Sequence, residues 1–199
     1  MSGADRRRRA ALAGHTGDAE TARGLLADPE AAVRATALAA LTRLGRATPA
    51  EVARALGDAD PLVRRRACEA AVAVEVDLLA SLGDDDSSVV ETAAWALGER
   101  APAASGAVAA LSGIATTHPD ALCREAAVAA LGAIGHVDGL AAILRATTDK
   151  PTVRRRAVIA LAPFEGAEVD AALQRALADR DWQVRQAAED LLAAGAEDD

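Results

Sequence analysis

Aromatic side chains are scarce in this chain of 199 residues, which has no Tyr, one Phe (Phe164) and two Trp (Trp95 and Trp182). Because 51% of the residues are nevertheless hydrophobic, Ala and Leu must fill most of the core. Ala and Leu favour helices, and β-branched residues form few runs of the kind that strands require. We therefore predict an all-α protein.

Long apolar runs are also absent, since no stretch approaches the ~20 residues that a membrane-spanning helix needs. Residues 6–9 are four arginines, and only a short Ala-Leu segment follows them before Gly14-His15. This segment is shorter than the apolar region of a secretory signal and lacks its cleavage site. We expect a basic first helix on a cytoplasmic protein that does not enter a membrane.

Cysteine and lysine are rare as well. Cys68 and Cys123 form neither a disulfide framework nor a metal-binding pair, and Lys150 is the single lysine. The formal net charge is −8, and acidic residues flank the arginine clusters. Nucleic-acid-binding domains usually carry a net basic charge or a continuous basic face, so we expect no nucleic-acid partner. Arginine also favours paired hydrogen bonds of fixed geometry to carboxylates over non-directional attraction to phosphates.

One short motif recurs six times along the chain. In its last copy, Asp179 stands five residues before the pair Val184-Arg185, and Ala188 stands four residues after Val184. Successive copies are 30, 26, 34, 30 and 31 residues apart, so the sequence is a repeat array. The marker pairs are Val33-Arg34, Val63-Arg64, Val89-Val90, Cys123-Arg124, Val153-Arg154 and Val184-Arg185.

The spacing around each marker predicts an amphipathic helix. Positions 0, 4 and 8, counted from the first marker residue, lie on one helix face and are apolar in every copy. Position 4 is Ala every time, which indicates that neighbouring helices approach closely there. Another amphipathic segment precedes each marked helix. The expected first helices are 18–27, 48–57, 75–83, 103–116, 137–148 and 167–178; the second helices are 30–45, 60–74, 87–100, 120–135, 151–163 and 181–195.

These residues resemble the HEAT-repeat family, particularly its bacterial branch of phycobilisome-lyase-like repeats. The resemblance rests on the Asp-x4-Val-Arg spacing and on helix pairs of roughly thirty residues. It implies an all-α, right-handed α-α superhelix, a solenoid of about six helix pairs, in one domain over residues 1–199. The expected repeats are 17–46, 47–74, 75–101, 102–136, 137–166 and 167–195, after an N-terminal capping helix at 4–14.

In HEAT repeats the motif's Asp and Arg are structural, and they form a ladder that ties the turn of one repeat to its neighbour. This sequence departs from the pattern at Val90, which replaces Arg, and at His118 and Thr148, which replace Asp. Asp120 and Asp149 are close enough to substitute in part. We therefore expect the ladder to be weakest in repeats three to five.

Catalytic motifs are missing from the sequence. It contains no GxSxG elbow and no glycine-rich phosphate loop, and its three histidines are scattered. Deoxyhypusine hydroxylase, a HEAT-repeat enzyme, holds two irons on His-Glu motifs, but here His15, His118 and His136 precede Thr, Pro and Val. We predict no catalytic residue, no metal site and no cofactor. The family resemblance leaves two enzymatic alternatives, a chromophore-lyase subunit and a hydroxylase-like oxidoreductase.

In a solenoid of this kind, the second helices line a long concave surface with the sides that face away from the core. Positions 2 and 6 should point there, with Trp95 as an aromatic anchor, although Trp95 could also fill a gap beside small residues. Trp182 is expected to cover the end of the array. We predict a monomeric, non-catalytic scaffold or adaptor whose concave face binds another protein. The predicted binding residues are Arg65, Arg66, Glu91, Trp95, Glu125, Arg155, Arg156 and Ile159.

Overall fold

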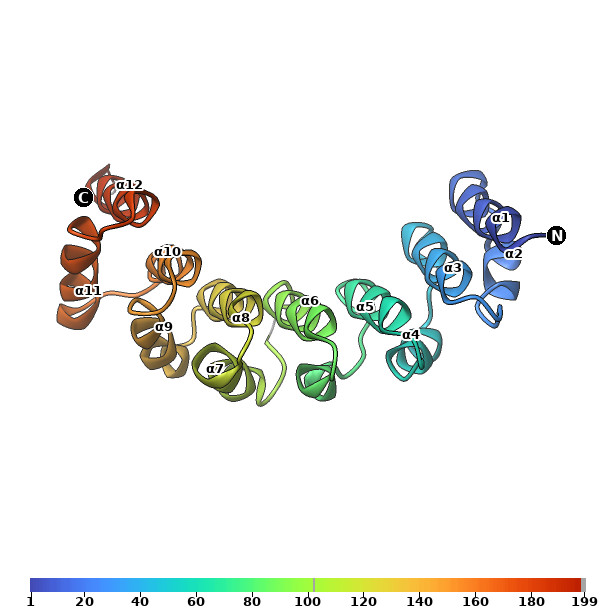
Figure 1. Cartoon of the computed structure of the whole chain (residues 1–199), viewed down its shortest axis with the longest axis horizontal. Coiled ribbons are helices and arrows are strands. Elements are labelled where there is room, and N and C mark those ends of the chain that lie inside the picture. Colours follow the sequence, from blue (N-terminus) through green and yellow to red (C-terminus); the bar gives the residue numbers. More distant parts are fainter. Residues whose placement is uncertain (102, 198–199) are drawn as a thin grey trace. The chain divides into compact units, whose positions relative to one another are not determined.

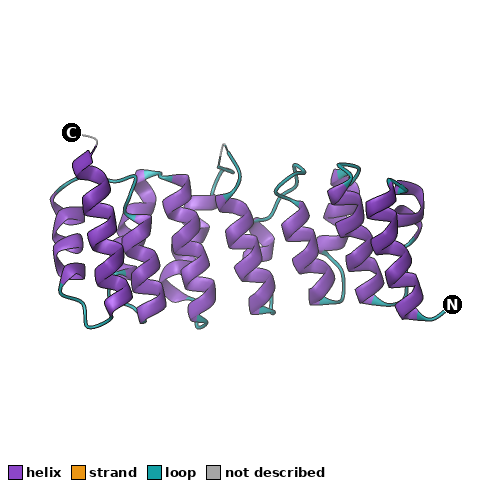
Figure 2. Ribbon diagram, turned by 90° about the horizontal axis from the view of Figure 1, so that it is seen from above, coloured by secondary structure: helices purple, strands orange, loops and turns teal. Residues whose placement is uncertain are grey.

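Helices are the only regular elements in the part of the chain that the computed structural model describes, residues 1–101 and 103–197 (Figures 1 and 2). The all-α repeat fold is thereby confirmed. The elements are α1 (Gly3–Thr16), α2 (Ala19–Gly24), α3 (Ala31–Arg43), α4 (Pro49–Leu56), α5 (Pro61–Ala70), η1 (Leu79–Gly83), α6 (Ser87–Gly98), α7 (Ala107–Thr117), α8 (Ala121–Ile134), η2 (Val137–Gly139), α9 (Leu140–Ala146), α10 (Pro151–Ala160), α11 (Ala167–Leu177) and α12 (Trp182–Glu197).

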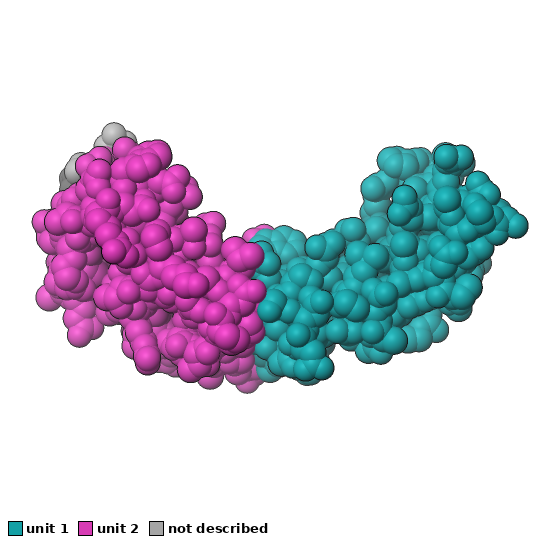
Figure 3. All heavy atoms as spheres, viewed as in Figure 1, with its two compact units in different colours: residues 1–96 teal, residues 97–199 magenta. Residues whose placement is uncertain are grey.

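The helices are arranged in two compact units, residues 1–96 and residues 97–199 (Figure 3). In the first unit, α1, α3 and α5 pack in one layer, and α2 and α4 pack beside them (Figure 1). In the second unit, α8, α10 and α12 form one layer and α7, α9 and α11 form the other. The single continuous domain over residues 1–199 stays a prediction.

Local sequence signals account for where the helices begin. Ser2 and Thr48 form capping boxes, in which the side chain accepts the backbone N–H three residues on and a carboxylate reaches back. Asp60 caps α5, whose first residue is Pro61, and Asp120 caps α8. The order of α1 and of the later helix pairs agrees with the order predicted from the repeat spacing.

One predicted helix is wrong. We expected an α-helix at residues 75–83, but the structure has only the 3-10 helix η1 over Leu79–Gly83. The repeat step is 26 residues here, the shortest in the chain. Residues 71–83 must therefore leave α5, turn, and reach Asp84, which leaves no room for a longer helix. Asp77 assists the tight turn because its side chain accepts the N–H of Leu79 at 2.9 Å.

The core follows the predicted helix face closely. Residues at positions 0, 4 and 8 of the second helices are buried in every repeat except at Leu192, which is 36% exposed. The uniform Ala at position 4 lies where the layers meet, and each of these alanines is buried. The leucines at position 8, such as Leu41, Leu97 and Leu161, are among the largest fully buried side chains.

Glycines let second helices approach each other closely. A Cβ built on Gly132 of α8 would lie 2.7 Å from the Cα of Ala160 on α10, which is closer than real Cβ atoms come to backbone. The pair Gly14–Ala40 joins α1 to α3 in the same way, at 2.9 Å. Glycine is therefore required at these positions by the spacing of the helices, and not by a positive φ.

Arginine forks join consecutive repeats, as the resemblance implied. The Nε and Nη2 atoms of Arg34 donate to both carboxylate oxygens of Asp58, at 2.8 and 2.6 Å, and its Nη1 donates to the carbonyl of Asp28 at 2.9 Å. Hydrogen bonds from arginine hold the pKa of each ladder aspartate below its usual value. The observed rungs are Arg6–Asp28, Arg34–Asp58, Arg64–Asp84, Arg124–Asp149 and Arg154–Asp179.

The ladder is stronger in the fifth repeat than we predicted. Asp149 takes the place of the ladder aspartate that is missing at Thr148, because Arg124 donates hydrogen bonds to both of its carboxylate oxygens, at 2.6 and 2.7 Å. His118 takes over only part of the aspartate's role. Its Nδ1 accepts the N–H of Asp120 at 3.1 Å, the turn contact that Asp58 makes with Asp60 elsewhere. Asp120 caps α8 instead of substituting for a ladder carboxylate.

Candidate partner-binding groove

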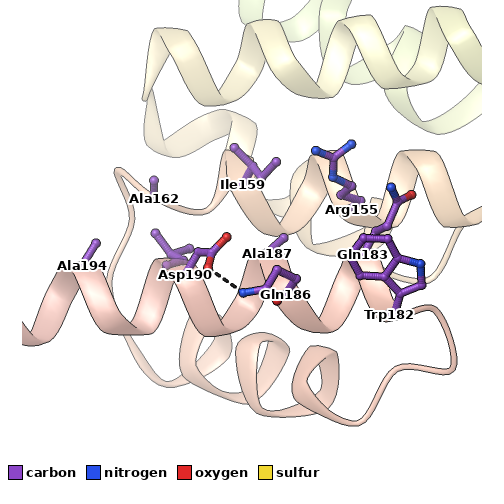
Figure 4. Close-up of a pocket in the computed structure, with 10 residues that line it drawn as sticks. Arg155, Ile159, Ala162, Trp182, Gln183, Gln186, Ala187, Asp190 and Ala194 are labelled. Atoms are coloured by element: carbon purple, nitrogen blue, oxygen red, sulfur yellow. Dashed lines mark hydrogen bonds between the residues drawn. The ribbon is translucent and has the colours of Figure 1, made fainter.

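A groove of about 350 Å³ lies between α10 and α12 in the second unit (Figure 4). The side chains of Arg155 and Ile159 line it from α10, and Trp182, Gln186 and Leu191 line it from α12. These two helices pack directly against each other, so the groove runs along the seam of a packed layer. A volume near the lower end of the range for ligand sites suits one or two large side chains.

Helical spacing explains why these side chains face the groove. Arg155 and Ile159 are one turn apart, and so are Trp182, Gln186 and Asp190 in α12. The core positions of the same helices are buried on the opposite side, which leaves these residues at the surface. The side chain of Trp182 is 64% exposed and that of Ile159 is 41% exposed. Two exposed apolar side chains that line one groove make it a candidate interaction site.

The charges of the groove are separated along its length. Arg155 makes no ion pair within the described residues, and it lies near Trp182 and Gln183 in Figure 4. Further along α12, Gln186 Nε2 donates to Asp190 Oδ1 at 2.8 Å, so this carboxylate is partly satisfied. The neighbouring Arg154 has the opposite role, because it is only 6% exposed and its fork binds Asp179.

Four of the predicted binding residues lie in this unit. Arg155 and Ile159 line the groove, whereas Arg156 and Glu125 form an ion pair of 3.7 Å between α10 and α8. Arg156 and Glu125 are half-buried. Their mutual pairing removes part of the charge that a partner could otherwise contact.

The other four predicted residues lie in the first unit. Arg65 and Arg66 are half-buried on α5, and Arg66 bonds to Glu69 on the same helix. Glu91 and Trp95 stand exposed on α6, with Trp95 exposed to 45%. The predicted residues therefore fall on two units, and a binding role for all eight stays a prediction.

Trp182 is the residue that the sequence reasoning underestimated. We expected it to cover the end of the array, but it is exposed and lines the groove beside Arg155. The spacing of Trp182 from the other residues of the last helix could have indicated that it faces the groove. Trp182 stands four residues before Gln186, which itself occupies position 2, so a helix that begins at residue 182 places both on one face.

Other chemistry finds little support in the described part of the chain. It contains no group of three or more His, Cys, Asp or Glu side chains that could hold a metal ion. Burial raises the pKa of the Cys68 thiol to about 11, so the nucleophilic thiolate is scarce at neutral pH. No helix among the described residues is both long and apolar enough to cross a membrane.

Comparison with known families finds the repeat pattern in the second unit. Residues 108–193 match a family model described as HEAT repeats. No protein of curated function matches the chain. The predicted resemblance to HEAT repeats is confirmed, while its narrower assignment to the phycobilisome-lyase-like branch stays a prediction.

Solved structures show the same fold at low sequence identity. The Escherichia coli protein YibA is 18% identical with a TM-score of 0.68, over 90% of this chain and 71% of that one. A designed armadillo repeat protein in complex with the peptide (KR)4 is 16% identical with a TM-score of 0.53, over 96% and 90%. Human deoxyhypusine hydroxylase is 20% identical with a TM-score of 0.50, over 94% and 78%. These identities support a shared fold and nothing about activity.

Proposed function

We propose that this chain, which carries HEAT repeats, is a non-catalytic scaffold that binds another protein through the exposed side of its second helices. The groove between α10 and α12 carries this proposal. It presents Trp182 and Ile159 to solvent beside Arg155, whose charge is not used by the fold. Trp and Arg are the residue types most enriched at binding hot spots.

The fold supports this role through rigidity. Arg154 fixes the turn before α12 with two hydrogen bonds to Asp179, and this turn positions Trp182. The helix seam beneath the groove is closely packed, with Ala157, Val158 and Ala188 buried. Little conformational freedom is therefore lost when a partner binds, which favours affinity.

Site-specific crosslinking tests the proposal. A photoreactive phenylalanine analogue at position 159 should crosslink to a discrete partner in cells that produce the protein. The same analogue at position 137 is the matched control, because Val137 is also an exposed apolar residue (68%) but does not line the groove.

The substitution Trp182→Ala should reduce the crosslink at position 159 at least tenfold, because it removes the largest exposed apolar group of the groove. Circular dichroism should show an unchanged helix content, since this side chain is mostly exposed. Equal crosslinking at positions 159 and 137, or no crosslink at 159, would mean that the groove is not the binding surface.

A further inference from the structure

We infer that the groove between α10 and α12 selects an acidic segment of the partner protein, in which a large apolar side chain stands within about one helical turn of an Asp or Glu. The apolar side chain would contact Ile159 or Trp182, which flank Arg155 in Figure 4, and the carboxylate would bind the guanidinium of Arg155. This inference rests on the proposed function and adds the chemistry of the partner.

The end of the groove at which α10 and α12 begin is positively charged. Figure 4 shows Arg155, Trp182 and Gln183 together at this end. The nearby carboxylates are already engaged: Asp149 by Arg124, Asp179 by Arg154, and Asp181 by the N–H of Gln183.

Three cations at the same helix starts are not engaged in this way. Lys150, Arg155 and Arg180 are exposed and form no ion pair within the described residues; of the three, only Arg155 lines the groove, while Lys150 and Arg180 lie near Asp149 and Asp179. The formal net charge of the chain is −8. Charges further away than about 8 Å are largely screened at physiological ionic strength, so these local cations decide which partner charge is favoured.

Asp190 sets the direction in which an acidic segment would lie. It stands eight residues after Trp182 in the same helix, about 12 Å along the axis at 1.5 Å per residue. A partner carboxylate at the end of the groove where α12 begins is therefore repelled less by Asp190 than one placed at the opposite end. Arg155 can also hold a carboxylate with two parallel hydrogen bonds, which fixes the orientation of the segment.

The middle of the groove supplies the apolar contact. Ile159 and Trp182 are exposed on either side of Arg155 (Figure 4), and the less exposed Ala187 and Leu191 also line the groove. Small side chains at Ala162 and Ala194 leave the far end open. A large apolar side chain from the partner would thus meet an apolar surface beside Arg155, while the main chain of the segment remained at the surface.

The test uses a displayed library of random twelve-residue peptides, selected in parallel on the full chain and on its Arg155→Glu variant. Peptides selected on the unchanged protein should carry Asp or Glu within four residues of Leu, Ile, Phe or Trp. They should bind Arg155→Glu at least tenfold more weakly, and the pool selected on that variant should shift towards Lys and Arg. Arg175→Glu is the matched control, because Arg175 is exposed on α11 and lies outside the groove.

Basic or uncharged selected peptides, an absence of enriched peptides, or equal affinity for Arg155→Glu would each overturn the inference. The outcome is separable from that of the proposed function. A partner crosslinked at position 159 through a segment without carboxylates would uphold the scaffold role and overturn the acidic preference. A failure of crosslinking would overturn both.

Discussion

Two adjacent arginines occupy contrasting environments in this chain. Arg154 is buried and binds Asp179 and the carbonyl of Asp149, whereas Arg155 is exposed in the groove. Their side chains differ by one helical position, which turns them by about 100° around α10. The ladder arginine is therefore engaged by the fold, whereas the side chain of its neighbour is available for the proposed recognition.

Replacing Arg154 by Ala should lower the free energy of unfolding by about 2 kcal/mol, because it removes charged hydrogen bonds and leaves Asp179 partly buried without its partner. Arg155→Ala should change it by less than about 0.5 kcal/mol, as is usual for an exposed site. Urea unfolding of the two variants measures both values. Equal losses would show that the ladder contributes no specific stability.

The ladder also predicts acid sensitivity. Hydrogen bonds from arginine lower the pKa of Asp58, Asp149 and Asp179 in the folded chain, so unfolding at low pH takes up protons. The resulting stability is fully present above about pH 4, the unfolded pKa of Asp, and is lost as the pH falls through the lower folded pKa.

Urea unfolding at a series of pH values below 5 measures this loss. Asp179→Asn should be less stable than the unchanged chain at neutral pH, and its stability should fall less steeply with acid because one titrating rung is gone. An identical pH dependence in both proteins would contradict a contribution from Asp179.

At the scale of the helix, close packing replaces the large aromatic side chains that the sequence lacks. Gly132 brings α8 against Ala160 of α10 so closely that an added methyl group would meet the backbone. Gly113 also stands within a helix, α7, but nothing lies within 4 Å of the place that an added methyl group would take there. Substitutions at these two glycines therefore distinguish the effect of helix packing on stability from the effect of helix propensity.

The substitutions Gly132→Ala and Gly113→Ala should act in opposite directions. Overpacking at position 132 should lower the free energy of unfolding by about 1–3 kcal/mol. At position 113 the gain in helix propensity should raise it by about 0.5–1 kcal/mol. Thermal and urea unfolding can measure both, and a stabilising Gly132→Ala would show that α8 and α10 can move apart at little cost.

The sequence predicts those elements that are set by local periodicity. Positions 0, 4 and 8 identify the buried face because helix geometry fixes their direction, and the pairs Arg34–Asp58 and Arg124–Asp149 follow from the repeat. The sequence does not reveal η1, because the apolar residues of 75–83 also fit a helix and only the path between α5 and α6 excludes it.

The groove was harder to predict for a similar reason. Arg155 and Ile159 were identified from their positions in one helix, but a groove needs a second wall. That wall depends on where α12 begins, and an error of one or two residues at its start decides whether Trp182 lies in a turn or on the helix face. Long-range packing of α10 on α12 is not encoded in any single repeat.

At the scale of the whole molecule, the fold is similar both to that of a designed armadillo repeat protein in complex with a peptide and to that of an enzyme, so the chemistry of the residues must distinguish between them. Human deoxyhypusine hydroxylase has a similar fold at 20% identity. In this chain no histidine is followed by glutamate. The described residues contain no cluster of three potential metal ligands.

Elemental analysis of protein purified without chelators should accordingly find iron well below one atom per chain, both as isolated and after incubation with ferrous iron and desalting. The matched control is the unfolded chain, which reports non-specific binding to carboxylates. Two irons retained per folded chain would contradict the non-catalytic scaffold.

The two tryptophans allow the most direct test of the central claim, that a partner binds in the groove between α10 and α12. In a Trp95→Phe variant, Trp182 is the only tryptophan, and its exposed ring should be quenched efficiently by acrylamide in the free protein. Addition of the partner captured at position 159 should reduce the quenching constant at least threefold. An unchanged quenching constant in the saturated complex would show that Trp182 stays in solvent and that the partner binds elsewhere.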